Sequence, residues 1–165
     1  MIQKNLQDSF IEFCKENKFE INNQQKKVVN QLDIFFKSKK TIFNYLINPK
    51  EKLCFYLSGN VGVGKTMLLD FVYDRLEIKK IRLHFNEFMI NFHNFNHKNK
   101  KINSIKSFVR NLKNKYNLIY LDEFQVTNIV DAMILGKLFE IIFSENIKII
   151  ITTNTKLNDL YKDGL

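Results

Sequence analysis

The chain has 165 residues, the size of a single domain, and 45% of them are hydrophobic, enough to bury a core. With one proline and five glycines the chain is not of a disordered type, and two cysteines are too few for a disulfide scaffold. No apolar run approaches the ~20 residues that a membrane-spanning helix needs. We therefore expect a cytoplasmic protein. The formal net charge of +9 would suit an anionic partner, but the basic residues are scattered along a Lys- and Asn-rich chain, so biased composition is the simpler explanation.

Residues 1–50 are predicted to form an N-terminal helical segment, because their apolar residues recur with helical spacing. Those residues are Leu6, Phe10, Phe13 and Cys14, and then Val28, Val29, Leu32, Phe35 and Phe36. The basic stretch that ends in Lys40 and the dipeptide Pro49-Lys50 punctuate the end of this segment. We therefore expect a separate segment, 1–50, in front of a second region, 51–165.

From residue 51 onward, short apolar runs alternate with longer helical patterns. The runs predict strands at 53–57, 81–85, 118–121 and 148–153, and the helices between them fall near 65–76, 87–96, 102–113 and 128–145. Strands that are almost continuously apolar and alternate with helices are typical of a parallel sheet covered on both faces. The sequence therefore predicts an α/β fold for 51–165.

A glycine-rich stretch follows the first predicted strand and fits the pattern G-x-x-x-x-G-K-[ST]. It comprises Gly59, Asn60, Val61, Gly62, Val63, Gly64, Lys65 and Thr66. Glycines let the backbone N–H groups curl around a β-phosphate, and the helix that starts near Gly64 directs its positive end at the same anion. Lys65 would bridge the β- and γ-phosphates, and the Thr66 hydroxyl would bind Mg²⁺. A plain glycine-rich turn is the alternative, which the flanking strand and helix disfavour.

Two acidic residues, Asp122 and Glu123, follow the third predicted strand, where a phosphate loop requires an acidic partner. Asp122 would hold Mg²⁺ through its water shell, and Glu123 would polarise the attacking water. The Asp-Glu pair indicates an ATPase with a carboxylate base rather than a kinase or a GTPase. The alternative is a charged strand end that faces solvent.

A third polar element, Asn154, follows the fourth predicted strand. In an ATPase core of the AAA+ type, a polar side chain at this place orients the lytic water. A helix N-cap for 156–161 is the alternative role for this asparagine.

Four blocks of the sequence resemble the AFG-like ATPases, an AAA+ branch that includes the cell-division ATPase ZapE and mitochondrial relatives. The blocks are YLSGNVGVGKTMLLDFVYD, LHFNEFM, YLDEFQVTNIVDAMILGKLFE and TTNTKLNDLYKDGL. With NNQQKKVVNQL near the front, the resemblance runs from about residue 19 to the last residue. The chain departs from the family pattern at Asn86, Asn128 and Thr155, where His, Asp and Arg, respectively, are usual. It is also shorter than members of the family.

The resemblance implies a P-loop AAA+ fold in three layers. Family cores have the strand order 5-1-4-3-2, and this chain stops before a fifth strand, an arginine finger and a helical lid, so we expect the order 1-4-3-2. The resemblance also implies ATP and Mg²⁺ as cofactors, with Gln25 and Met67 as further nucleotide contacts, and Lys65, Glu123 and Asn154 as catalytic residues.

The same resemblance implies ATP-driven remodelling of protein partners at the division ring or the inner membrane surface, by a homo-oligomer in the full-length form, with no nucleic acid. Two alternatives remain open. The chain could bind nucleotide without turnover, which the missing lid and arginine finger favour. It could instead be a helicase-loader-like ATPase that binds DNA, which only the basic net charge supports.

Overall fold

The computed structural model describes residues 5–37, 52–99 and 104–156. Two compact units make up the chain. The first comprises residues 1–52 and 64–76, and the second comprises residues 53–63 and 77–165. None of the helices in the described ranges is both long and apolar enough to cross a membrane. The division into segments 1–50 and 51–165 stays a prediction.

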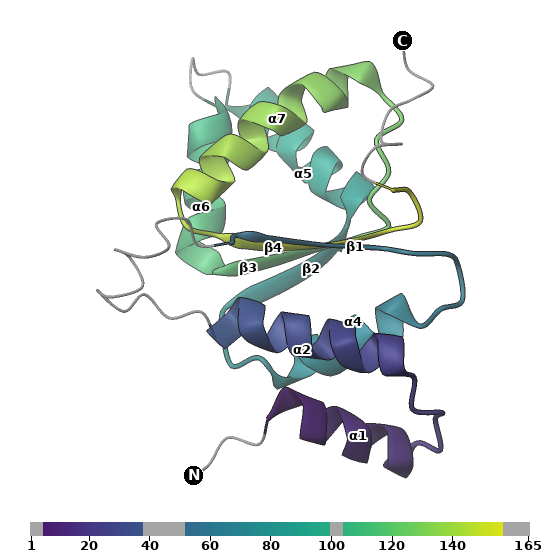
Figure 1. Ribbon diagram of the computed structural model, residues 1–165. Helices are drawn as coiled ribbons and strands as arrows, with labels where there is room; N and C mark the ends of the chain where they lie inside the picture. The colour runs from purple at the N-terminus through teal and green to yellow at the C-terminus, as the bar shows by residue number, and fades with distance from the viewer. Residues whose placement is uncertain (1–4, 38–51, 100–103, 157–165) are drawn as a thin grey trace. The chain divides into compact units, whose positions relative to one another are not determined.

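In its described residues, the first unit contains the helices α1 (Leu6–Glu16), α2 (Asn23–Lys37) and α4 (Lys65–Arg75). The helices α1 and α2 lie side by side (Figure 1). Phenylalanine rings join α1 to α4, since the centroid of Phe71 lies 5.1 Å from that of Phe10 and 5.0 Å from that of Phe13. The Arg75 guanidinium covers the Phe71 ring at 3.9 Å. The predicted helical segment is confirmed at 6–16 and 23–37, and its remainder, 38–50, lies outside the described residues.

The second unit is built on a parallel sheet of β1 (Cys54–Ser58), β2 (Lys80–His84), β3 (Leu118–Asp122) and β4 (Lys148–Thr153). The strand order is β1-β4-β3-β2, as predicted. Every residue of β3 is buried, which explains why this strand reads as an unbroken apolar run up to its terminal aspartate. In the parallel register, Leu121 of β3 lies beside Ile151 of β4 and Leu83 of β2.

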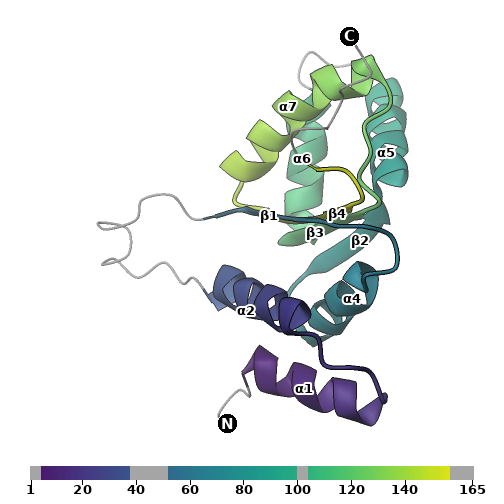
Figure 2. The ribbon, with the colours of Figure 1, turned by 45° about the vertical axis from the view of Figure 1, so that its right-hand side comes forward.

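Three helices, α5 (Phe85–Lys98), α6 (Ser104–Lys115) and α7 (Ile129–Ser144), lie on one face of this sheet (Figure 2). Their apolar sides and the sheet form one core, with Phe88, Phe92, Val109, Leu138 and Ile142 among its fully buried members. Each strand ends within a residue of its predicted end, and each helix boundary lies within two residues of its prediction, so the predicted α/β architecture is confirmed for the described residues.

Candidate nucleotide-binding site

The glycine-rich loop leaves the end of β1 beside the end of β4. The Gly59 amide donates a hydrogen bond of 3.3 Å to the Thr153 carbonyl, which joins the start of the loop to the last residue of β4. Gly62 has a φ of +83°, a backbone conformation that side chains rarely adopt, so glycine is required for the turn itself. Val61 and Val63 flank this turn with side chains exposed to solvent. The loop therefore turns where the motif places its middle glycine.

The second part of the motif opens α4, within the first unit. Gly64 is the N-cap residue, with φ +81° and no side-chain capping hydrogen bond, and the first turn of α4 contains no acidic residue. Lys65 and Thr66 occupy this turn. Because the N–H groups at a helix N-terminus carry partial positive charge, this end of α4 is suited to an anion.

Gln25 of α2 lies directly against the start of α4. A Cβ atom placed on Gly64 would come within 2.7 Å of Gln25 Nε2 and 3.6 Å of Met67 Cε. A side chain at Gly64 would be strained by the φ of +81° and would displace the end of the Gln25 side chain, and both residues predicted as additional nucleotide contacts, Gln25 and Met67, lie at this position. Their contact with a nucleotide stays a prediction.

Asp122 ends β3 as one of the few buried charged side chains among the described residues. Its Oδ1 accepts hydrogen bonds from the Thr152 hydroxyl and from the Glu123 amide, the latter at 3.0 Å, and its Oδ2 is 2.6 Å from Arg82 Nη2. Burial raises the pKa of Asp122, but the hydrogen bonds from Thr152 and Arg82, the Arg82 charge and the Glu123 amide outweigh burial and hold the pKa below its ordinary value of 3.8. Asp122 is therefore ionised at neutral pH.

Glu123 follows in a contrasting environment. Its φ of +53° lies in the left-handed region, which is uncommon for a residue with a side chain and costs on the order of 1 kcal/mol. The side chain is 77% exposed, and Oε2 lies 3.5 Å from Nδ1 of His84. This backbone turn separates two neighbouring carboxylates, one buried against β4 and one free to meet solvent.

Asn154 is the first residue after β4, and it is exposed. The backbone beside it is fixed, because Thr155 donates its amide to the Thr153 hydroxyl at 3.1 Å and accepts a hydrogen bond of 2.9 Å from the Tyr56 hydroxyl on its carbonyl. The helix that Asn154 would cap in the alternative interpretation lies outside the described residues. Both roles of Asn154 therefore stay predictions.

Within the second unit, four of the predicted residues come together at the carboxyl ends of the strands. Gly59 follows β1, Asp122 ends β3 with Glu123 after it, and Asn154 follows β4. A further backbone bond of 2.8 Å, from the Phe124 amide to the Thr152 carbonyl, joins the segment after β3 to the end of β4. In open parallel sheets, ligands bind at the carboxyl ends of the strands.

Two residues of this edge were missed by sequence reasoning, Arg82 and His84. In the register of β2 against β3, Arg82 lies beside Tyr120 and His84 beside Asp122. The Arg82 guanidinium also covers the Tyr120 ring, at 4.9 Å. The signal was present in the sequence as two basic residues at alternate positions of a strand, but it became readable only once β2 was known to pair with β3.

The donor set fits magnesium. Mg²⁺ prefers oxygen ligands such as an ionised carboxylate, and Asp122 supplies one at the end of β3, whereas Thr66 stays a predicted ligand. No cluster of His, Cys, Asp and Glu suited to another metal occurs in the part of the chain that the structure describes.

Comparison with known proteins agrees with this arrangement. A family model described as AFG1-like ATPase matches residues 6–165. Lactation elevated protein 1 homolog B of Danio rerio is 40% identical over 124 residues, which cover 67% of this chain and 25% of that protein. Cell division protein ZapE of Escherichia coli is 35% identical over 112 residues, which cover 67% of this chain and 30% of ZapE. The chain thus spans a quarter to a third of the length of these relatives.

Solved structures show the same fold at low sequence identity. The DnaA protein of Aquifex aeolicus, solved with AMPPCP bound, superposes with a TM-score of 0.58 at 16% identity and covers 96% of this chain and 44% of that one. The DnaC helicase loader superposes with a TM-score of 0.56 at 17% identity and covers 85% of this chain and 76% of that one. The fold is that of the P-loop AAA+ proteins, and with the match over residues 6–165 the chain belongs to the AFG1-like ATPase family.

Proposed function

We propose that this chain is the nucleotide-binding part of an ATPase that binds Mg-ATP at the loop 59–66 and hydrolyses it. The contrast between Asp122 and Glu123 carries the proposal. Asp122 is buried, ionised and surrounded by donors, whereas Glu123 is exposed on a left-handed turn directly after it. Neighbouring carboxylates in such different environments are suited to different roles, one as a ligand and one as a base.

In this proposal the backbone N–H groups of Gly59–Gly64 and the first turn of α4 hold the phosphates. Lys65 neutralises the charge on the β- and γ-phosphates, while Thr66 and Asp122 hold Mg²⁺. Mg²⁺ held by these residues would supply positive charge to offset the charge on the phosphate oxygens. Gln25 and Met67 contact the nucleotide beside Gly64, which is supported by their position there.

Glu123 is the general base of the proposed reaction, because its carboxylate can accept a proton from a water molecule that attacks the γ-phosphate. Asn154 orients that water. The hydrogen bonds that join the segments after β1 and β3 to the last two residues of β4 support the common placement of Glu123 and Asn154 at the carboxyl ends of the strands.

We infer that ATP turnover serves to remodel protein partners. ZapE, one of the relatives, is by its name a cell division protein. By analogy we propose protein partners at the division ring or at the inner membrane surface, a cytoplasmic location, and a homo-oligomer as the working form of the full-length protein.

Binding without turnover is the alternative function, and it is favoured by one observation. Thr155 stands after Asn154, at the end of β4, where the family resemblance implies an arginine, so the positive charge expected there is missing. Equilibrium binding of Mg-ATP and release of phosphate, measured on one preparation, separate the two functions. If the parent binds Mg-ATP and releases phosphate, and the release disappears in Glu123→Gln, the result supports an ATPase. If both the parent and Glu123→Gln bind Mg-ATP without releasing phosphate, the result supports binding without turnover.

DNA binding is a separate alternative that rests on the net charge of +9. The similarity to the DnaC helicase loader is a likeness of fold at 17% identity and adds no argument for DNA. A mobility shift with short DNA at several salt concentrations tests it, because phosphate contacts weaken steeply as salt rises. We expect no shift at physiological salt.

A further inference from the structure

Thr153, the last residue of β4, is bonded to each of the segments that follow β1, β3 and β4. Its carbonyl accepts a hydrogen bond of 3.3 Å from the Gly59 amide, at the start of the glycine-rich loop. Its hydroxyl donates a hydrogen bond of 2.6 Å to the Phe124 carbonyl and accepts one of 3.1 Å from the Thr155 amide. Thr153 is only 3% exposed, so these bonds form away from bulk water.

The two partners of the Thr153 hydroxyl lie next to the two residues that are proposed to act on the attacking water. Glu123 directly precedes Phe124, and Asn154 lies between Thr153 and Thr155. A hydroxyl can donate one hydrogen bond and accept another at the same time, whereas an apolar side chain of the same shape can do neither. One hydroxyl therefore holds the backbone beside both residues.

Glu123 depends on support from its neighbours, because its φ of +53° is a conformation that persists only where the surrounding structure holds it. On one side, Asp122 accepts a hydrogen bond from the Thr152 hydroxyl. On the other side, the Phe124 amide donates to the Thr152 carbonyl at 2.8 Å, and the Phe124 carbonyl accepts from Thr153. The Thr153 hydroxyl thus contributes one of the two bonds that hold Glu123 from its carboxyl side.

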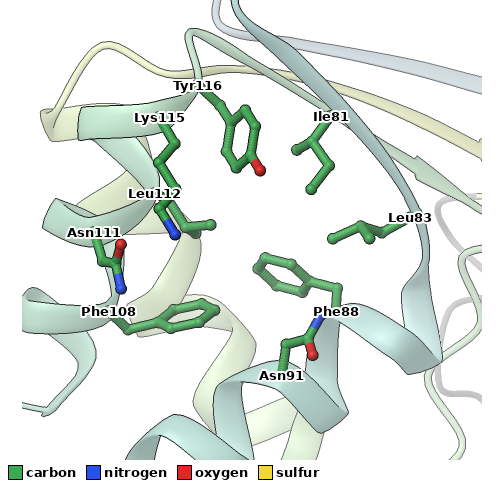
Figure 3. Close-up of a pocket in the computed structure, with 9 residues that line it drawn as sticks. All are labelled: Ile81, Leu83, Phe88, Asn91, Phe108, Asn111, Leu112, Lys115 and Tyr116. Carbon is green, nitrogen blue, oxygen red and sulfur yellow. The ribbon is translucent and has the colours of Figure 1, made fainter.

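The Phe124 ring is fixed in the core. Its centroid lies 4.6 Å from that of Phe85 and 6.2 Å from that of Phe139. An apolar groove of about 180 Å³ lies elsewhere in this core, between β2, α5 and α6 (Figure 3), and it is lined by residues such as Phe88 but not by Phe124. The groove therefore gives the Phe124 ring no room to shift, and the Phe124 carbonyl is a fixed acceptor for Thr153.

We propose that Thr153 is a positioning residue whose hydroxyl holds Glu123 and Asn154 in a fixed arrangement relative to each other. This inference rests on the proposed function, in which Glu123 is the base and Asn154 orients the water. A displacement of about 1 Å can slow a reaction on the order of 10²-fold, so loosening of either residue has a measurable effect. In this proposal the hydroxyl contacts neither nucleotide nor metal, so its loss lowers the rate and not the affinity for Mg-ATP.

The variant Thr153→Val removes the hydroxyl and keeps the shape of the side chain. We expect single-turnover phosphate release, followed with radiolabelled ATP over long incubation, to slow at least about tenfold. The dissociation constant of Mg-ATP should stay within about threefold of that of the parent. Unchanged phosphate release in Thr153→Val would overturn the proposal. Thr153→Ala, which also lacks the hydroxyl, takes its place with the same expectations if circular dichroism shows that Thr153→Val does not fold.

Rescue by the conservative variant separates positioning from a purely structural role. Thr153→Ser loses the methyl group and keeps the hydroxyl, so it should release phosphate within about threefold of the parent rate. Equal losses of rate in Thr153→Ser and Thr153→Val would show that packing of the methyl group, and not the hydroxyl, is what matters, and would refute the proposal.

Thr152→Val is the matched comparison, because it removes the neighbouring buried hydroxyl of β4, which donates to Asp122. We expect Thr152→Val to raise the Mg²⁺ concentration needed for nucleotide binding and Thr153→Val to leave it unchanged. An increase of the same size in both variants would show that loss of either hydroxyl disturbs the end of β4 in the same way, and would contradict the assignment.

Hydrogen exchange of single amides, measured by NMR on the nucleotide-free protein, tests the placement without any turnover. Thr153→Val should speed the exchange of both the Phe124 and the Thr155 amides severalfold, and Thr153→Ser should exchange like the parent. Faster exchange at Thr155 alone would show that the hydroxyl does not hold the segment after β3, and the inference would fail. If the parent itself released no phosphate, the proposed function would fail, whereas faster exchange at both amides would still support the link between the two segments.

Discussion

Asp122 and Glu123 stand next to each other in the sequence and differ in almost every physical respect. Asp122 is packed against β4, with the Thr152 hydroxyl and Arg82 as donors. Glu123 turns away through a positive φ and is mostly exposed. The difference comes from one residue of backbone, and it supports our proposal of a ligand role for the first carboxylate and a base role for the second.

This difference predicts separate effects of two conservative variants. Glu123→Gln keeps shape and loses the base, so it should bind Mg-ATP like the parent and show no phosphate release. Asp122→Asn keeps shape and loses the charge, so it should require a higher Mg²⁺ concentration for nucleotide binding. Titrations with Mg-ATP at several Mg²⁺ concentrations measure both. Equal loss of binding in the two variants would contradict the division of roles.

Arg82 is the resident counter-ion of Asp122, at 2.6 Å, and a metal ion at Asp122 must compete with it. Arg82→Ala should therefore lower the Mg²⁺ concentration needed for nucleotide binding several-fold. In the metal-free protein, Arg82→Ala should also lower the free energy of unfolding by about 1–2 kcal/mol. This is less than the loss of a partner from a fully buried ion pair, because the Arg82 side chain is one-third exposed.

Arg82→Lys is the matched control, because it keeps the charge and should keep the Mg²⁺ requirement near that of the parent. A Mg²⁺ requirement that is unchanged in Arg82→Ala would show that the ion pair does not hold Asp122 in the metal-free protein.

At the scale of elements, short apolar runs and the helical spacing of apolar residues were sufficient to place the strands and helices within two residues of their observed ends. The order of the strands came from the family resemblance and not from any residue. Contacts across strands could not be predicted, since Arg82 reaches Asp122 only through the β2–β3 register. The left-handed backbone of Glu123 has no sequence signal either, because this conformation favours glycine.

The start of α7 gives a prediction at this scale. Asn128 is the N-cap, and its side chain accepts a hydrogen bond of 2.8 Å from the Val130 amide. Asn128→Ala should therefore lower the free energy of unfolding by about 1 kcal/mol, whereas Asn128→Asp should keep the cap and match the parent or exceed it. Urea unfolding of the three proteins measures the difference. An Ala variant as stable as the parent would show that this cap contributes nothing.

At the scale of the whole molecule, the chain covers 25% and 30% of the two relatives compared, while the family match extends over residues 6–165. It contains three arginines, of which Arg82 is engaged with Asp122 and Arg75 with Phe71. The third, Arg110, lies on α6. The nucleotide site of this chain by itself therefore has few cations for the charge of a transition state.

We accordingly predict very slow hydrolysis by the isolated chain. An arginine supplied to a phosphoryl-transfer site accelerates the reaction by about 10³–10⁵. Single-turnover phosphate release should be detectable only over long incubation, with Glu123→Gln as the control for contaminating ATPases. Turnover of several per second by the purified chain, absent in that control, would contradict the prediction.

The central claim is that the loop 59–66 binds the phosphates of a nucleotide, and calorimetric titration of Mg-ATP into the parent chain and into Lys65→Ala tests it most directly. Lys65 is in the first turn of α4, and its proposed role is to neutralise phosphate charge, so circular dichroism of the variant is compared with that of the parent to establish that both are folded. The account predicts saturable binding to the parent and no measurable binding to Lys65→Ala. Binding of Mg-ATP with the same affinity by both proteins would contradict it.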